Sequence, residues 1–250
     1  MTTHLYCILP HVIRGGLPPG LLGLGGARVR ALVVGELVAW VSDAERERGA
    51  LMEEVRAHDA VVEAALSSGA TPMPARFGQT FADDDACSQA LSRRAASLES
   101  ALQAVQGCIE MTLIITPSTR RMLRELEPVV PQMLEPGAPG AGRQYLETLR
   151  AREASSGTVE RLARELASRL ETAVGPLLRK KASPRSVVRM PMLTLSHLID
   201  RDDVDAYREA LSAVAAGPEL RFLVVGPRAP YSFCGLDAGP AGAHGMNLAD

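Results

Sequence analysis

The sequence predicts an α+β protein made of two successive units and a C-terminal tail. Short β-rich runs precede helical patterns in the first part of the chain, and a new β-rich run at residues 108–116 begins a second series. From Gly226 onward the chain is rich in Gly, Pro and Ala, which is typical of an extended tail that becomes ordered only by docking. With 250 residues, of which 46% are hydrophobic, the chain is long enough for two small domains or one large one and can bury a core.

The first unit opens with three β-rich runs and a helical pattern. Residues 4–10, 29–34 and 37–42 predict strands, and the last two form a hairpin candidate across Gly35. The Gly-rich residues 15–26 lack the GxGxxG spacing of a phosphate-binding loop, so they indicate a flexible connection. A helix is predicted by an apolar stripe at three- and four-residue spacing, formed by Leu51, Val55, His58, Val62 and Leu66.

The stretch Thr71–Phe81 separates this helix from the next helical pattern. Pro72 and Pro74 fix φ and withhold backbone donors, so this part should be extended. Gly78 permits a turn that a β-carbon would obstruct. Arg76 is the one long charged side chain in the stretch, and we expect it to brace the turn or to pair with an acidic residue of a helix. The stretch therefore predicts a strand and a turn that join two helices.

The helix that follows begins at an acidic cluster. Asp83, Asp84 and Asp85 favour capping of a helix N-terminus over cation binding, because adjacent carboxylates without further oxygen ligands are typical of caps. The helical pattern continues as far as Gly107. His58 lies on the apolar stripe of the preceding helix, which favours a buried, hydrogen-bonded histidine over a catalytic or metal-binding one. The first unit thus has the coarse order βββ-α-β-α.

The second unit begins with a strand at residues 108–116, and its order β-α-β(β)-α-β is close to the split βαβ, ferredoxin-like plan. These assignments predict an N-terminal domain at 1–106, a C-terminal domain at 107–226 and a tail at 227–250. The further elements are predicted in this order: short helical turns at 120–127, a loop at 136–142, a long helix at 143–179 that Gly157 could kink, one or two strands at 187–199, a helix capped by Asp202, and a strand at 220–225.

Composition argues against several classes of function. A net charge of −2 and 4% aromatic residues give no basic or stacking surface for nucleic acid or an anionic membrane. No apolar segment approaches the roughly 20 residues needed to span a bilayer, and no signal peptide is evident. The four cysteines and five histidines are scattered without metal-ligand spacing, and no nucleophile motif is present. We therefore expect no catalytic, cofactor or metal site, no small-molecule substrate, and a cytoplasmic location.

Two segments are the most specific signals of the sequence, Pro72-Met-Pro-Ala-Arg-Phe-Gly78 and Gly226-Pro-Arg-Ala-Pro-Tyr-Ser-Phe233. Together with three further segments they resemble, in order and spacing and over essentially the whole chain, the gas vesicle GvpF/GvpL family. The tail carries Arg228-Ala229 where the family usually has Trp-Pro, and His197-Leu-Ile-Asp200 stands for an expected Tyr-Leu-Val-Asp. The other segments that carry the resemblance are the opening Leu-Tyr-Cys-Ile-Leu-Pro, His58-Asp-Ala-Val-Val-Glu and Gly107-Cys-Ile-Glu110.

The resemblance implies two modified ferredoxin-like domains with an ordered tail, and a non-enzymatic accessory role in gas vesicle assembly. The implied partners are the small hydrophobic wall protein and other gas vesicle proteins, with the chain associated with gas vesicles. The alternative is a small-molecule-binding regulator or an enzyme on the same scaffold, with a pocket near Arg76, His58 or Tyr231. We expect structural or partner-contact roles for the motif residues His58, Pro74, Arg76, Phe77, Gly78, Glu110, Gly226, Pro227, Pro230, Tyr231 and Phe233.

Overall fold

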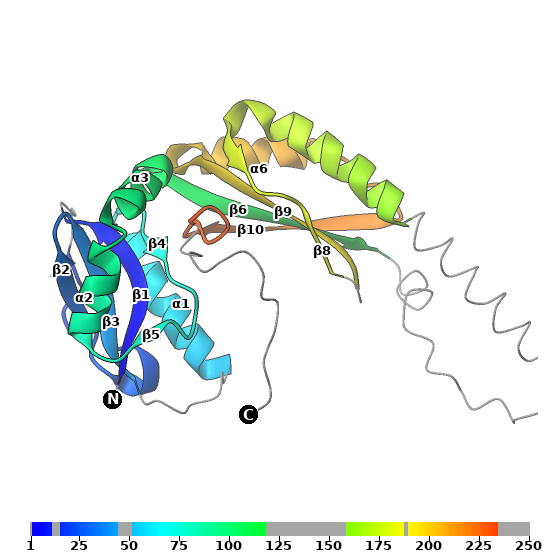
Figure 1. Ribbon diagram of the computed structural model, residues 1–250. Helices are drawn as coiled ribbons and strands as arrows, with labels where there is room; N and C mark the ends of the chain where they lie inside the picture. The colour runs from blue at the N-terminus through cyan, green and yellow to red at the C-terminus, as the bar shows by residue number, and fades with distance from the viewer. Residues whose placement is uncertain (1, 12–15, 45–51, 119–158, 188–189, 235–250) are drawn as a thin grey trace, which may run out of the picture. The chain divides into compact units, whose positions relative to one another are not determined.

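The computed structural model describes residues 2–11, 16–44, 52–118, 159–187 and 190–234. The chain divides into two compact units, Met1–Gln106 with Tyr231–Asp250, and Gly107–Pro230. Each unit contains one five-stranded antiparallel sheet with helices packed against it (Figure 1). The α+β class predicted from the sequence is confirmed.

The sheet of the first unit has the strand order β2-β3-β1-β4, with β5 also paired to β1. The β2–β3 hairpin turns at Gly35, whose φ of 58° lies in the left-handed region that glycine tolerates. β1 is buried along almost its whole length, as its central position in the sheet requires. The strands are β1 (Thr2–Pro10), β2 (Arg30–Val34), β3 (Leu37–Ala44), β4 (Met73–Pro74) and β5 (Thr80–Phe81).

The helices of this unit contact both faces of β1. His4 of β1 bonds to His58 of α1, whereas its neighbour Thr3 bonds to Asp84 at the start of α2. Because successive strand residues point to opposite faces, α1 and α2 lie on opposite faces of the sheet at this point. The helical elements are η1 (Leu24–Gly26), α1 (Met52–Ser67), α2 (Asp84–Ser92) and α3 (Ala95–Val105).

The single helix expected after Asp83 is two helices. Asp83 caps α2 as predicted, because its side chain accepts a hydrogen bond from the N–H of Ala86 at 2.8 Å. At the end of α2 the N–H of Arg94 bonds to the carbonyl of Leu91, three residues back instead of four, which tightens the last turn. The chain then starts α3 without a glycine or proline at the break.

The sheet of the second unit has the order β10-β6-β9-β7, with β8 paired to β9. Residues 159–174 form a helix, and this helix and α6 cover the same face of the sheet (Figure 1). The named elements are β6 (Cys108–Pro117), η2 (Gly175–Leu177), β7 (Leu178–Lys181), β8 (Arg185–Val187), β9 (Met190–Asp200), η3 (Arg201–Asp203), α6 (Val204–Ser212) and β10 (Leu220–Arg228).

Three boundaries in the second unit differ from the prediction. The long helix ends at residue 174 instead of 179, because Pro176 cannot donate to a helical hydrogen bond, and Leu178 belongs to strand β7. Asp203, not Asp202, is the N-cap residue of α6, because a 3₁₀ turn precedes the helix. β10 continues to Arg228, so Gly226 and Pro227 lie in a strand. The turns at 120–127, the loop at 136–142 and the start of the long helix with Gly157 lie outside the described residues.

Candidate functional site

The sequence motifs of the first unit meet around His58. This residue lies on the buried stripe of α1 and is 1% exposed. Its Nδ1 atom is 2.9 Å from Nε2 of His4 in β1, and its Nε2 atom is 3.1 Å from the carbonyl oxygen of Ala75. His58 therefore links the first strand to the Pro72–Gly78 motif through two buried hydrogen bonds. The expectation that His58 is buried and hydrogen-bonded agrees with this geometry.

The bonding pattern assigns the protons of the two imidazoles. The carbonyl of Ala75 can only accept, so Nε2 of His58 carries a proton and donates it. In the neutral ring Nδ1 is then a bare acceptor, and Nε2 of His4 donates to it. Burial, together with the charge that His58 would carry, lowers the pKa of His4 to about 4, and burial also lowers the pKa of His58. Both rings are neutral at physiological pH.

Aromatic rings enclose this histidine pair. The ring centroid of Tyr6 is 4.8 Å from that of His4, and the ring of Phe77 is 5.9 Å from that of His58 in an edge-to-face arrangement. The hydroxyl of Tyr6 accepts from the N–H of Leu24 and lies 2.8 Å from the hydroxyl of Ser42. The two imidazole rings thus pack against aromatic rings, and the hydroxyl of Tyr6 has its own hydrogen-bond partners.

The Gly-rich loop packs against this tyrosine. A β-carbon on Gly23 would overlap the hydroxyl of Tyr6, so the loop approaches the ring this closely only because residue 23 is glycine. The N–H of Gly23 also donates to the carbonyl of Ala27 at 2.8 Å. The sequence indicated a flexible connection here, but residues 23–27 form a compact turn against the core.

The Pro-Ala-Arg-Phe-Gly residues form the edge of the sheet and a tight turn. Pro74 pairs with Cys7 of β1, and the N–H of Ala75 donates to the carbonyl of Tyr6 at 2.8 Å. The carbonyl of Arg76 then accepts from the N–H of Gln79, and Gly78 adopts a φ of 85° at the third position of this turn. The predicted strand and turn are confirmed.

The side chains of this turn differ in their surroundings. Phe77 is half-buried against the histidine pair, while the side chain of Arg76 is exposed. Gly78 is also exposed, so its role is conformational. Bracing of the turn by the Arg76 guanidinium stays a prediction, whereas the Arg76 backbone does close the turn.

Tyr231, shortly after β10, contacts α1, the helix that contains His58. The hydroxyl of Tyr231 donates to the carboxylate of Asp59, with 3.0 Å between Oη and Oδ1. Cys234 is buried and Phe233 is half-buried, although Tyr231 itself is 40% exposed. Residues 231–234 therefore pack against the first unit, and Cys234 is buried in it.

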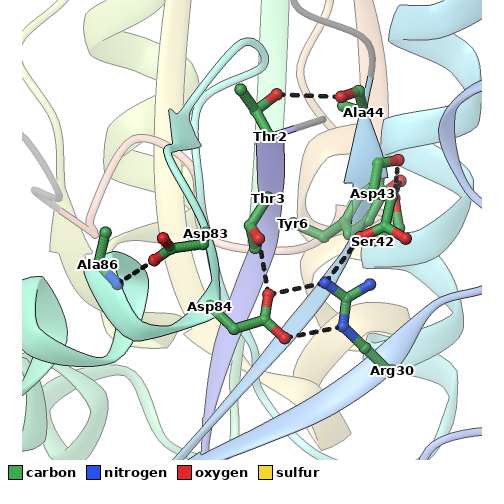
Figure 2. A network of polar contacts seen from close by, with 10 residues as sticks. All are labelled: Thr2, Thr3, Tyr6, Arg30, Ser42, Asp43, Ala44, Asp83, Asp84 and Ala86. Atoms are coloured by element: carbon green, nitrogen blue, oxygen red, sulfur yellow. Dashed lines mark hydrogen bonds and ion pairs between the residues drawn. The ribbon is translucent and has the colours of Figure 1, made fainter.

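A second polar network holds α2 against the sheet (Figure 2). The guanidinium of Arg30 in β2 makes two bonds to Asp84, of 3.0 Å from Nε and 2.7 Å from Nη2, and also lies 2.9 Å from Asp43. Thr3 donates to the same carboxylate at 2.6 Å. The hydrogen bond from Arg30 lowers the pKa of Asp84. Asp84 is thus an anchor for β2 and β1 instead of part of a cation site.

The motif residues of the second unit meet where β10 passes β6. Gly226 has a φ of 131°, and a β-carbon there would lie 2.8 Å from the backbone oxygen of Glu110. The pairing of β10 with β6 shifts between Val225 and Arg228, and the Gly226–Pro227 peptide bond inside this bulge is cis. Glu110 is 6% exposed and accepts from the hydroxyl of Thr112, whereas Pro227 is exposed and Pro230 is buried.

A second buried histidine lies in this unit. His197 of β9 has its Nδ1 atom 2.8 Å from the hydroxyl of Tyr207 in α6. Its Nε2 atom is 3.7 Å from Glu171, and Glu171 also pairs with Lys181 at 2.9 Å. Burial lowers the pKa of His197, and burial raises the pKa of Tyr207. These residues join β9 to both helices of the unit.

The polar groups of His58 are committed to bonds within the protein, whereas Nε2 of His197 is buried without a hydrogen-bond partner in the described part of the chain. Both polar nitrogens of His58 are occupied by intramolecular bonds, and His58 is closed off from solvent. Within the described ranges, no group of three His, Cys, Asp or Glu residues is arranged to hold a metal ion. Among the same residues, no helix has the length and apolarity to cross a membrane.

Several residues of these clusters could not be identified from the sequence around them. The partners of His58 and Asp84, namely His4 and Arg30, are each 54 positions away in the chain. Gly23 is one of several glycines in its loop, and only the Tyr6 contact distinguishes it. The one available hint was that His4 and Tyr6, two residues apart in a strand, point to the same face.

The two antiparallel sheets, each with helices packed against it, define an α+β protein. The chain belongs to the family described as gas vesicle synthesis protein GvpL/GvpF, whose family model matches residues 2–235. Two relatives come from Streptomyces sp. (strain CB03234). Gas vesicle protein L is 30% identical, with 89% of each chain covered, and gas vesicle protein F is 27% identical over 93% of this chain and 99% of that protein.

Two solved structures share the fold. The crystal structure of the gas vesicle protein GvpF from Anabaena sp. PCC7120 matches with a TM-score of 0.70 at 20% identity, over 93% of this chain and 98% of that one. The GvpF structure from Microcystis aeruginosa matches with a TM-score of 0.71 at 18% identity, with the same coverage of each chain. The resemblance seen in the sequence motifs is confirmed.

Proposed function

We propose that this protein is a non-enzymatic accessory or minor structural protein of gas vesicle assembly, which binds the hydrophobic wall protein and other gas vesicle proteins. The observation that carries the proposal is the family match from residue 2 to residue 235, which leaves room for no other domain in the matched part. A wall subunit with a large apolar surface needs a partner that covers this surface before the subunit joins the shell. We place the protein in the cytoplasm, associated with gas vesicles.

The geometry of the motif residues supports a non-catalytic role. An enzyme or a small-molecule regulator would need polar groups that converge on a ligand near Arg76, His58 or Tyr231. Instead, His58 bonds to His4 and Ala75, and Tyr231 bonds to Asp59. These commitments favour the assembly role over the alternative.

We also infer that the second unit is a ferredoxin-like domain. In the split βαβ plan the first strand lies in the centre, the fourth strand lies beside it on one edge, and the third lies between the first and the second. The order β10-β6-β9-β7, with residues 159–174 and α6 as the two connecting helices, supports this description. The first unit, with the order β2-β3-β1-β4, is a more strongly modified version.

The function is tested by deleting the gene in a host strain that has no other member of the family. We expect vesicles to be lost and to return when the wild-type chain is supplied. In the complemented strain, the tagged protein should co-purify with the wall protein. Normal vesicles in the deletion strain would overturn the proposal, as would a protein that co-purifies with no gas vesicle component.

A matched pair of variants separates assembly from catalysis. Arg76→Lys keeps the exposed charge and the backbone turn, and His58→Gln keeps a donor toward Ala75 and an acceptor toward His4. Both variants should restore vesicles wherever the folded protein accumulates to the wild-type level. Loss of vesicles with a fully folded His58→Gln protein would instead favour a chemical role for the imidazole.

A further inference from the structure

Among the residues that the structure describes, helices cover one face of the sheet of the second unit and leave the other without a helix. Residues that alternate along β6, namely Ile109, Met111, Leu113 and Ile115, are buried on the face covered by α6 and the 159–174 helix. Thr112, Ile114 and Thr116, between them in the strand, point to the other face and are only half-buried. Among the described residues of this unit, the second face is therefore open around Ile114, whereas Glu110 and Leu198 at one end of it are buried. We call this second face the open face.

Uncharged side chains fill the centre of the open face. Directly paired residues share a face, so Thr194, Ile114 and Leu223 form one row across β9, β6 and β10. Ser196, Thr112 and Val225 form the next row by the same pairing. Leu223 is 60% exposed, although it lies in the middle of a strand. The centre thus consists of small polar, β-branched or apolar side chains and is free of charge.

Basic side chains border this centre on both lateral sides. Arg185 of β8 pairs with Thr194 at one end of the first row, and Arg221 of β10 pairs with Thr116 on the opposite edge. Lys180 of β7 and Arg228 of β10 flank the row that contains Leu198 and Glu110. All four cations are exposed. The acidic side chains nearby are fewer: Glu110 is buried and lies opposite Arg228 in the strand pairing, Asp200 is bonded to Arg179, and Glu219, just before β10, is exposed. The border of the open face therefore has a positive surplus.

A sheet face that merely contacts water usually mixes both signs of charge with polar side chains. The open face differs, because its centre is uncharged and basic side chains outnumber acidic ones along its border. An uncharged centre with a charged rim is the layout of a protein interface, in which the rim sets orientation and the centre is desolvated. Because basic side chains predominate in this rim, the occupant is expected to bring carboxylates to it, above all to Arg185 and Arg221.

We propose that the open face docks a segment of another gas vesicle protein whose apolar side chains are bordered by Asp or Glu. The apolar side chains cover Leu223, Ile114 and Val225, and the acidic border meets Arg185 and Arg221. This inference rests on the proposed function, because it assumes that the partner belongs to the vesicle. It adds which surface is used and what the partner segment must contain.

The test places a photoreactive amino acid, p-benzoylphenylalanine, at position 223 in the full chain, which is co-expressed with the complete set of gas vesicle proteins. Mass spectrometry then identifies the crosslinked peptide. We expect a peptide from another vesicle protein with an apolar run bordered by Asp or Glu. The yield should fall by about fivefold or more in the Arg185→Glu, Arg221→Glu variant, and also when the ionic strength rises from about 0.05 M to about 0.5 M.

The control variant Arg28→Glu, Arg56→Glu makes the same change of net charge at exposed positions of the first unit. Its crosslinking yield should equal that of the wild type, and both double variants should keep the wild-type melting temperature. Crosslinks only to this chain or to a second copy of it would overturn the proposal, and so would binding to anionic lipid vesicles in place of a protein. Insensitivity to charge reversal at 185 and 221 would overturn it as well.

A second photoreactive position distinguishes failure of this inference from failure of the proposed function. Val33 in β2 of the first unit is 58% exposed and serves as that position. Crosslinks to vesicle proteins from position 33 but not from position 223 would reject the open face and leave the assembly role standing. The deletion strain decides the assembly role independently.

Discussion

The Nε2 atom of His4 and the Nδ1 atom of His58 lie 2.9 Å apart and join the first strand of the chain to its first long helix. The bond requires a neutral His58, because a proton on Nδ1 of His58 would present a second donor to the Nε2–H of His4 in a buried site. The same ring of His58 donates to Ala75, inside the Pro-Ala-Arg-Phe-Gly motif. The contacts among β1, α1 and the motif, which are separate in the sequence, thus depend on the protonation state of His58.

The stability of the protein should therefore fall in mild acid. The folded-state pKa of His4 is about 4, below the ordinary value of 6.5, so the unfolded chain binds more protons between these two pH values. The stabilisation is fully present above pH 6.5 and is lost as the pH falls toward 4. The shift corresponds to about 3 kcal/mol for His4 alone. Urea unfolding at a series of pH values measures this loss.

Two variants test whether the His4–His58 pair causes this loss of stability in acid. The double variant His4→Gln, His58→Gln removes both titrating rings and should show a shallower loss between pH 6.5 and pH 4. His11→Gln removes an exposed histidine and should keep the wild-type profile. A double variant whose pH profile matches that of the wild type would show that the pair does not control acid stability.

Gly23→Ala should destabilise the first unit by about 2 kcal/mol, because the new β-carbon overlaps the hydroxyl of Tyr6 and displaces the Leu24 N–H bond. Gly175→Ala is the control: a β-carbon at position 175 would meet no atom within 4 Å, so its effect should stay within about 0.5 kcal/mol. Thermal unfolding measures both. In a double-mutant cycle, Tyr6→Phe should relieve part of the Gly23→Ala penalty, and strict additivity would contradict the contact.

Gly226→Ala should destabilise the second unit by about 2 to 4 kcal/mol. The alanine would have to adopt a φ of 131°, and its β-carbon would lie 2.8 Å from the backbone oxygen of Glu110 and from the sulfur of Met111. Gly217→Ala is the matched control, because Gly217 also has a positive φ, of 82°, but faces open space. Its cost should be about 1 kcal/mol. Equal costs by denaturant unfolding would show that steric contact at Gly226 is not important.

Local patterns predicted much of this fold. The stripe of α1, the hairpin at Gly35 and the proline-bounded turn at Gly78 each follow from side-chain spacing or from the φ preference of one residue. The break between α2 and α3 has no such signal, because neither glycine nor proline marks it. The apolar period of a helix can also continue into a strand, which is why Leu178 was assigned to the preceding helix.

The buried clusters could be predicted only in part. His58 was placed inside by its neighbours on the helix stripe, but the identity of its partner depends on how β1 packs against α1. Similarly, Asp84 was predicted to belong to a cap, whereas its bonds to Arg30 and Thr3 follow from the position of α2 on the sheet. Contacts between residues far apart in the chain are set by tertiary packing, which a single sequence does not display.

The tail residues give the last prediction. A chain that ends at Pro230 lacks the Tyr231–Asp59 hydrogen bond and the buried side chain of Cys234, whereas a chain that ends at Cys234 keeps both. The shorter chain should be less stable by about 1 to 3 kcal/mol, from lost apolar burial and one hydrogen bond. Tyr231→Phe in the longer chain should cost less than about 1 kcal/mol, because this tyrosine is 40% exposed. Coincident melting curves for the two truncated chains would mean that residues 231–234 do not stabilise the first unit.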